Sequence, residues 1–277
     1  MLSRLASASA RGFLVAIMVM MPALMLPTVA SDTAEIIALV AIFAAVLTTI
    51  EYSSSYPSII EFRDAPPFNR VRFLSLFITV ILIATMCRGE VIANNLSIFV
   101  MAVGALIANV LDFPFSPVRM MSFLLPENVS PHQLLLIRAS TALSMLIALL
   151  SLAFFVIMLS SSKWPKGLKG FNVWVNLPTF DPSAGADVVE RLNRDALVNV
   201  GLGLIMLYFV PVTFWGASVV FKPIDVTSHH TMIWVVAAWA FLPASLFMRG
   251  IAMRRVAEMI AERRRRNEKL NQALVAA

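Results

Sequence analysis

Seven separate apolar stretches account for most of this chain, and each is about long enough to cross a lipid bilayer. A span needs roughly 20 apolar residues, because each helical residue rises about 1.5 Å. Every backbone N–H and C=O group in the bilayer core must be paired within the protein, so continuous apolar runs must be helices. We therefore predict an all-α fold, a polytopic transmembrane helical bundle of about seven membrane helices. The predicted helices cover residues 13–30, 34–50, 71–86, 91–111, 134–160, 196–220 and 232–248.

The composition supports the same class of protein. Of the 277 residues, 59% are hydrophobic and only 14% are charged. About a quarter of the residues of a soluble domain are charged. We expect an integral membrane protein, and we place it in the inner (plasma) membrane of a bacterium.

Two connectors between the predicted helices, residues 51–70 and 112–133, mix apolar and charged residues with several prolines. This mixture is typical of segments that lie in the lipid headgroup layer. Each connector begins with an acidic residue, Glu51 or Asp112, and follows a pair of predicted helices. The shared pattern leaves open whether the two halves are an internal repeat. A longer polar segment, residues 161–195, contains Asp187, which can cap a helix that continues into the sixth span.

Residues 249–277 differ from the rest of the chain, because they hold eight of the 22 Lys and Arg residues but only three of the 16 Asp and Glu residues. We predict that this basic tail continues the last membrane helix into the cytoplasm. Basic residues near a membrane attract anionic lipids by about 1 kcal/mol each. The tail also offers a docking surface for another membrane protein or an acidic partner, whereas no fold signature indicates nucleic-acid binding. The predicted contact residues are Arg254, Arg255, Arg263, Arg264, Arg265 and Arg266.

The charges give conflicting indications of the orientation in the membrane. Lys and Arg are enriched on the cytoplasmic side of membrane proteins, which places the C-terminus in the cytoplasm. With seven crossings the N-terminus then lies outside. The basic residues around the first five helices favour the opposite orientation for that part of the chain. Both preferences hold only if the number of crossings is even, which requires one segment not to span.

Polar side chains within the apolar stretches are the candidates for an intramembrane site. A charge in the bilayer is a functional hypothesis by default, and Arg138 is the candidate here. It either extends to the headgroups, pairs with Asp112, or attracts an anion at a cavity mouth. The uncharged candidates bind a substrate or ion, or hydrogen-bond between helices. The complete set of candidates is Asn94, Asn95, Asn109, Arg138 and Asn199.

Small residues predict where helices approach one another closely, since small side chains allow backbones to meet in membranes. The partner is another helix of this chain or another protein. One stripe lies on the second predicted helix and a small-xxx-small pair lies on the fourth. These packing residues are Ala34, Ala38, Ala41, Ala45, Gly104 and Ala108.

No catalytic signature accompanies these features, and we expect no cofactor and no metal. No acidic residue lies deep in a predicted span, which disfavours proton-coupled transport. We expect a non-enzymatic accessory, assembly or structural component of a larger membrane complex. One alternative is a small transporter or channel with a site at Asn94, Asn95 and Asn199. Proline-broken helices at Pro22, Pro27, Pro211 or Pro243 would serve that site.

A third alternative is a lipid-modifying enzyme at the membrane interface. Its candidate groups are Asp112, His132 and Arg138, which lie close together in the sequence around the second connector. The adjacent pair His229-His230 with Asp225 is a weaker candidate for a metal, and we interpret it as a solvated loop.

Overall fold

The computed structural model describes residues 2–27, 30–125, 129–161, 164, 172–181, 187–220 and 228–275, and the regular structure in these ranges is helical. The all-α prediction is therefore confirmed. The elements are α1 (Leu2–Met25), α2 (Ser31–Ser53), α3 (Phe68–Gly89), α4 (Asn95–Val110), α5 (Pro117–Met120), the 3₁₀ helix η1 (Met121–Leu124), α6 (Pro131–Ser161), α7 (Val173–Asn176), α8 (Val188–Val220) and α9 (His229–Val275).

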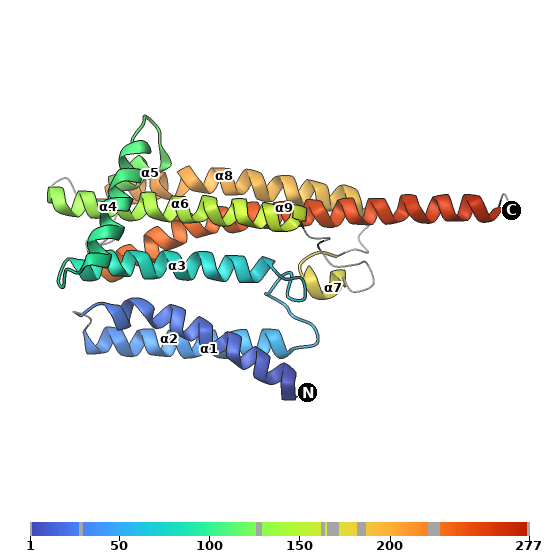
Figure 1. Ribbon diagram of the computed structural model, residues 1–277, viewed down its shortest axis with the longest axis horizontal. Coiled ribbons are helices and arrows are strands. Elements are labelled where there is room, and N and C mark those ends of the chain that lie inside the picture. The colour runs from blue at the N-terminus through green and yellow to red at the C-terminus, as the bar shows by residue number, and fades with distance from the viewer. Residues whose placement is uncertain are drawn as a thin grey trace.

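Six of these helices, α1, α2, α3, α6, α8 and α9, are long and apolar enough to cross a membrane. The fourth predicted span, residues 91–111, is shorter in the structure, because α4 has only 16 residues. At about 1.5 Å per residue it is about 24 Å long, less than the hydrocarbon core of a bilayer. Figure 1 shows α4 lying across the ends of α3 and α6 instead of running beside them.

A capping box accounts for the late start of α4. The Ser97 N–H donates to Asn94 Oδ1 at 2.8 Å, and the Asn94 N–H donates to Ser97 Oγ at 3.1 Å. This reciprocal pair satisfies backbone donors that the first turn of a helix leaves free. It fixes the start of α4 at Asn95, after the break that follows α3.

Both termini lie at the same end of the bundle (Figure 1). We call this the tail end. It also carries the connector between α2 and α3 and the short helix α7, whereas α4, α5 and η1 lie at the opposite end. Six helices that are able to cross, with both termini at one end, match the even number of crossings that the two charge preferences of the sequence require. The two connectors whose shared pattern raised the question of an internal repeat lie at opposite ends of the bundle. Only the first of them follows two helices that are long enough to cross the membrane.

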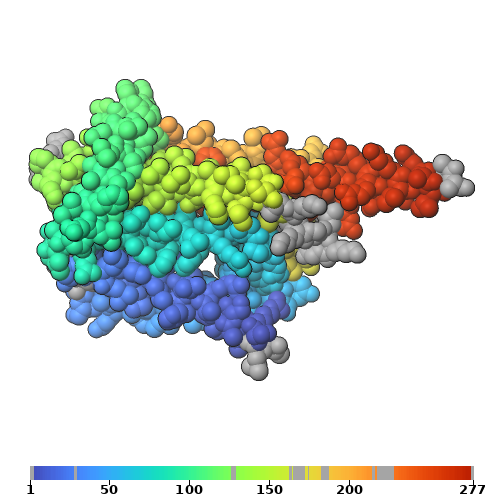
Figure 2. Space-filling model, viewed as in Figure 1, coloured from blue at the N-terminus to red at the C-terminus, as the bar shows by residue number. Residues whose placement is uncertain are grey.

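The last membrane helix and the basic tail are one helix, α9, of 47 residues. It continues past the bundle as a single helix (Figures 1 and 2). Helix α8 begins at Val188 directly after Asp187, as the helix-cap prediction requires. The helices run on through Pro22, Pro211 and Pro243, so these three prolines do not divide a span into half-helices.

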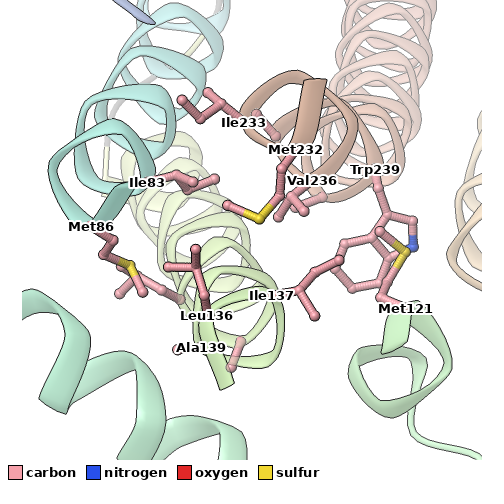
Figure 3. Packing of buried hydrophobic residues seen from close by; sticks show 14 of the residues in the cluster. Ile83, Met86, Met121, Leu136, Ile137, Ala139, Met232, Ile233, Val236 and Trp239 are labelled. Carbon is pink, nitrogen blue, oxygen red and sulfur yellow. The ribbon is translucent and has the colours of Figure 1, made fainter. Parts of the chain in front are cut away.

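Apolar side chains fill the centre of the bundle toward the opposite end. Figure 3 shows Ile83 and Met86 of α3 meeting side chains of α6 and α9. Trp239 of α9 is 1% exposed, and its indole N–H donates to the Leu207 carbonyl of α8 at 3.1 Å. The space between α3, α6 and α9 is therefore a packed core.

A second core lies at the tail end and is rich in aromatic rings. Phe62, from the connector between α2 and α3, is fully buried and lies 4.5 Å from Phe68 and 5.8 Å from Trp164, centroid to centroid. Phe155 of α6 completes the cluster, 5.8 Å from Phe68. The connector is thus an integral part of the bundle, because its own side chains form the core beneath it.

Small residues allow close contact in three helix pairs: α1 with α2, α4 with α6, and α8 with α9. A Cβ at Gly12 of α1 would lie 2.5 Å from the Ala45 carbonyl of α2, and one at Gly104 of α4 would lie 2.8 Å from the Ala139 carbonyl of α6. Ala108 is buried beside Gly104 on α4. In the stripe on α2, Ala41 is buried, Ala38 and Ala45 are half-buried and Ala34 is exposed.

We expect Gly250→Ala to destabilise the contact between α8 and α9, because the added Cβ would meet the Ala196 carbonyl at 2.7 Å. Overpacking of this kind costs about 1–3 kcal/mol. The matched control is Gly201→Ala, since a Cβ there meets nothing within 4 Å. Thermal denaturation in detergent should show a lower Tm for Gly250→Ala alone. Equal Tm values for the two variants would contradict the packing.

We expect cysteine probes at both termini to react from the same side of sealed membrane vesicles. Buried Cys87 is first replaced by serine. Ser3→Cys and Ala273→Cys should then be labelled from one side by a membrane-impermeant maleimide, and Ser130→Cys from the other. Labelling of the two terminal probes from opposite sides would show an odd number of crossings.

Candidate functional site

The connector between α2 and α3 is held in place by two charged side chains. The Glu51 carboxylate accepts backbone N–H bonds from Ser58 at 3.0 Å, Ile59 at 2.9 Å and Ile60 at 3.2 Å. The Arg63 guanidinium donates to the Ser54 carbonyl at 2.6 Å and to the Glu51 carbonyl at 3.2 Å. These bonds satisfy backbone groups in a segment that has no regular structure of its own.

The connector is also joined to the segment around α7. The Phe62 N–H donates to the Asn176 carbonyl at 2.6 Å, and the Asp64 N–H donates to Asn176 Oδ1 at 3.0 Å. The indole N–H of Trp164 donates to the Ala65 carbonyl at 3.3 Å. Segments about 110 residues apart in sequence thus form one layer over the tail end.

Glu61, Thr179, Asn199 and Arg249 form a charged cluster beneath this layer, which we call the arginine clamp. Arg249 of α9 donates from Nε to Glu61 Oε2 at 2.5 Å and from Nη2 to Glu61 Oε1 at 2.7 Å. Its Nη1 donates to Asn199 Oδ1 of α8 at 2.8 Å, while the Thr179 hydroxyl donates to Glu61 Oε1 at 2.9 Å. A bidentate arginine–carboxylate pair fixes geometry as well as charge.

The clamp is mostly removed from solvent, since the side chains of Arg249 and Glu61 are 27% and 12% exposed. It joins four parts of the chain: the connector, the α7 segment, α8 and α9. Its bonds link these four parts directly, so the arrangement is suited to holding helices in place.

A second ion pair ties the basic tail to the bundle. Arg264 Nη1 lies 2.6 Å from Asp187 Oδ1, at the residue before α8. The Arg264 hydrogen bond holds the pKa of the Asp187 carboxyl below its usual value. The contact therefore persists into acidic solution and weakens as the pH falls through that lowered pKa.

The structure separates the predicted intramembrane polar residues. Asn94 caps α4, Asn95 begins it and Asn109 lies near its end, all at the opposite end of the bundle. Asn199 belongs to the arginine clamp near the tail end. These asparagines therefore do not line one common cavity.

Arg138 pairs with Asp112, which is one of the three roles considered for it from the sequence. Its Nη2 lies 2.5 Å from Asp112 Oδ2. Arg119 lies 3.7 Å from the other oxygen of Asp112, so two guanidinium groups share this carboxylate. His132, the third group of the enzyme alternative, pairs with Glu90 at 2.9 Å.

The His132–Glu90 pair lines a cavity of about 350 Å³ between α3, α4 and α6, whose other lining residues are largely apolar. Asp112 and Arg138 do not line this cavity. His229 and His230 begin α9 and so do not form a loop, and Asp225 lies outside the described residues. Within the described ranges, no group of three or more His, Cys, Asp or Glu residues could hold a metal ion.

The predicted tail residues all lie on α9. Arg254 and Arg255 both pair with Glu258, at 3.6 and 3.3 Å, and Arg264 pairs with Asp187. Arg263, Arg265 and Arg266 are exposed. The arginine clamp does not follow from the sequence pattern, because Arg249 begins the basic tail and Glu61 lies in the first connector. The signal that was present is a charged run, residues 61–64, interleaved with a large aromatic side chain.

Comparisons with protein-family models, with curated proteins and with solved structures find no match to this chain. Its function must therefore be inferred from its own residues.

We expect single substitutions in the arginine clamp to be strongly destabilising. Glu61→Gln leaves the Arg249 charge without a counter-charge, and Arg249→Gln does the same to Glu61. Breaking a buried ion pair lowers the free energy of unfolding by about 3 kcal/mol or more. Because Arg249 is partly exposed, we expect a loss near the lower end of that range. The double variant should lose less stability than the two single variants combined. Thermal denaturation in detergent measures all three, and additive losses would show that the two groups do not interact.

Proposed function

We propose that this protein is a non-enzymatic accessory, assembly or structural component of a larger complex in a bacterial inner membrane. It docks an acidic partner protein through the basic part of α9. The single observation that carries this proposal is that α9 continues beyond the bundle as a lone helix (Figure 1).

The lone part of α9 is exposed along its whole described length, from Glu262 to Val275. At about 1.5 Å per residue it extends about 20 Å. A helix this short is marginal in water without packing. Its attachment to a membrane helix and its pairing with Asp187 hold it in one direction. A rigid arm with basic residues is a suitable docking element for a surface of opposite charge, because complementary charges steer and orient partners.

The distribution of basic residues supports a cytoplasmic tail end. Among the described basic residues, only Arg88, Arg119 and Arg138 lie toward the opposite end. The others lie toward the tail end, which is the asymmetry expected for a cytoplasmic face. They are Arg4, Arg11, Arg63, Arg70, Arg72, Arg191, Arg194, Arg249, Arg254, Arg255, Arg263, Arg264, Arg265, Arg266 and Lys269.

The membrane part offers a second surface for assembly. Helix α2 packs mainly on α1, which in turn packs on α3. The outward face of α2 is apolar and exposed, with Ile36, Leu39 and Phe43 each more than 60% exposed. Such a face meets lipid or the helices of a neighbouring membrane protein.

The packed centre supports this function over transport. Apolar side chains fill the space between α3, α6 and α9 (Figure 3), and the asparagines proposed for a transport site lie at different ends. A transporter needs a site near the middle of the bilayer that opens to either side.

We expect the wild-type protein, tagged and extracted in mild detergent, to migrate with partner proteins in a stoichiometric assembly. Replacing Arg263, Arg264, Arg265 and Arg266 with glutamine should release the cytoplasmic partner. Replacement of the same four residues with lysine is the matched control, because it keeps the charge. Migration of the wild-type protein alone would contradict the proposal. The proposal would also be contradicted if the glutamine variant kept the whole assembly and terminal labelling showed that its orientation in the membrane was unchanged.

A further inference from the structure

Arg72 is a charged residue of α3 that the arginine clamp does not use. It lies in the second turn of a membrane-spanning helix and is half-buried. Its guanidinium lies 5.1 Å from the ring centroid of Phe68 and 5.7 Å from that of Phe241. Its Nε is buried without a hydrogen-bond partner, and its Nη1 makes only a long bond of 3.4 Å to Asn69 Oδ1.

No carboxylate of the described residues lies within 4.0 Å of Arg72. Other inward-facing arginines have one: Arg63 pairs with Asp64, Arg138 with Asp112 and Arg249 with Glu61. Glu61 cannot compensate both arginines fully, because both of its oxygens bind Arg249 and one also binds Thr179. Arg72 therefore carries a positive charge in a membrane helix with aromatic rings as its close partners, which is costly without an anion.

Arg72 lies near the junction between α3 and the α1–α2 hairpin, since its charge acts on Tyr52 of α2. Tyr52, at the end of α2, contacts Asn69, and the Arg11 guanidinium of α1 lies 4.6 Å from the Tyr52 ring. A second cation thus stands at the same junction. Figure 2 shows openings between this hairpin and α3, consistent with α2 packing mainly on α1. In a bilayer such openings are filled by acyl chains.

We propose that Arg72 binds the phosphate of an anionic phospholipid from the leaflet at the tail end, with an acyl chain between the α1–α2 hairpin and α3. A guanidinium has several donors in one plane and suits a phosphate, which accepts two of them at once. The terminal Nη2 group, which makes no bond to the described residues, would donate to one phosphate oxygen, while Nε stays buried. The bound lipid would also fill the junction between the hairpin and the rest of the bundle.

The test uses the full-length protein, purified in mild detergent and examined by native mass spectrometry while phosphatidylglycerol is added. The wild-type protein should retain one phospholipid more firmly than the others, and Arg72→Gln should bind it at least about tenfold more weakly, because charged hydrogen bonds are lost. Arg88→Gln, an exposed arginine at the opposite end, is the matched control and should bind as the wild type does. The four-glutamine tail variant should also keep this lipid, which separates the site from binding by the tail.

Thermal denaturation of the wild-type protein tests the same site without a substitution. Phosphatidylglycerol should raise the Tm more than phosphatidylcholine does, and inorganic phosphate should not substitute for it. The proposal is overturned if the wild-type protein retains no lipid, if Arg72→Gln retains it equally, or if inorganic phosphate protects as well as the lipid. If Arg72→Gln does not fold, Arg72→Lys is used. It should keep the preference for phosphatidylglycerol with weaker binding, and binding unchanged from wild type would contradict the role of the guanidinium.

Discussion

The bidentate pair between Arg249 and Glu61 is the interaction on which the tail end of this protein depends. It joins the last membrane helix to a connector that has no regular structure, and Asn199 and Thr179 bring α8 and the α7 segment into the same cluster. An unpaired charge at this depth would be costly, so the pair also fixes where α9 leaves the bundle. The direction of the lone basic helix follows from this junction and from the Arg264–Asp187 contact beyond it.

An even number of spans reconciles the charges of the whole chain. With α4 lying across the bundle, six helices can cross the membrane and both termini lie at one end. The basic residues near the N-terminus, in the connector and in the tail then share one face. The opposite end is built differently, since α4, α5 and η1 lie there against α6 and α8 and the few basic residues are largely used by Asp112.

The sequence was informative where a single physical rule dominates. Apolar length identified the spans that became α1, α2, α3, α6, α8 and α9, and the cap at Asp187 located the start of α8. It was less informative where local chemistry competes with hydropathy. Residues 91–111 are apolar enough to suggest a span, but the Asn94–Ser97 capping box begins a new, shorter helix. The arginine clamp could not be predicted, because Glu61 and Arg249 are 188 residues apart and meet only through the folding of the connector. The orphaned Arg72 is likewise visible only once its neighbours are known.

The most direct test of this account is hydrogen–deuterium exchange of the connector, residues 54–67, in the wild-type protein and in Arg249→Gln. The amides of Phe62 and Asp64 are bonded to Asn176, and those of Ser58, Ile59 and Ile60 to Glu51. If the clamp holds the connector in place, exchange across this segment should accelerate in Arg249→Gln, while the amides of α4 at the opposite end should be unchanged. Unchanged exchange in the connector would show that its own hydrogen bonds suffice and would contradict the central role of the clamp.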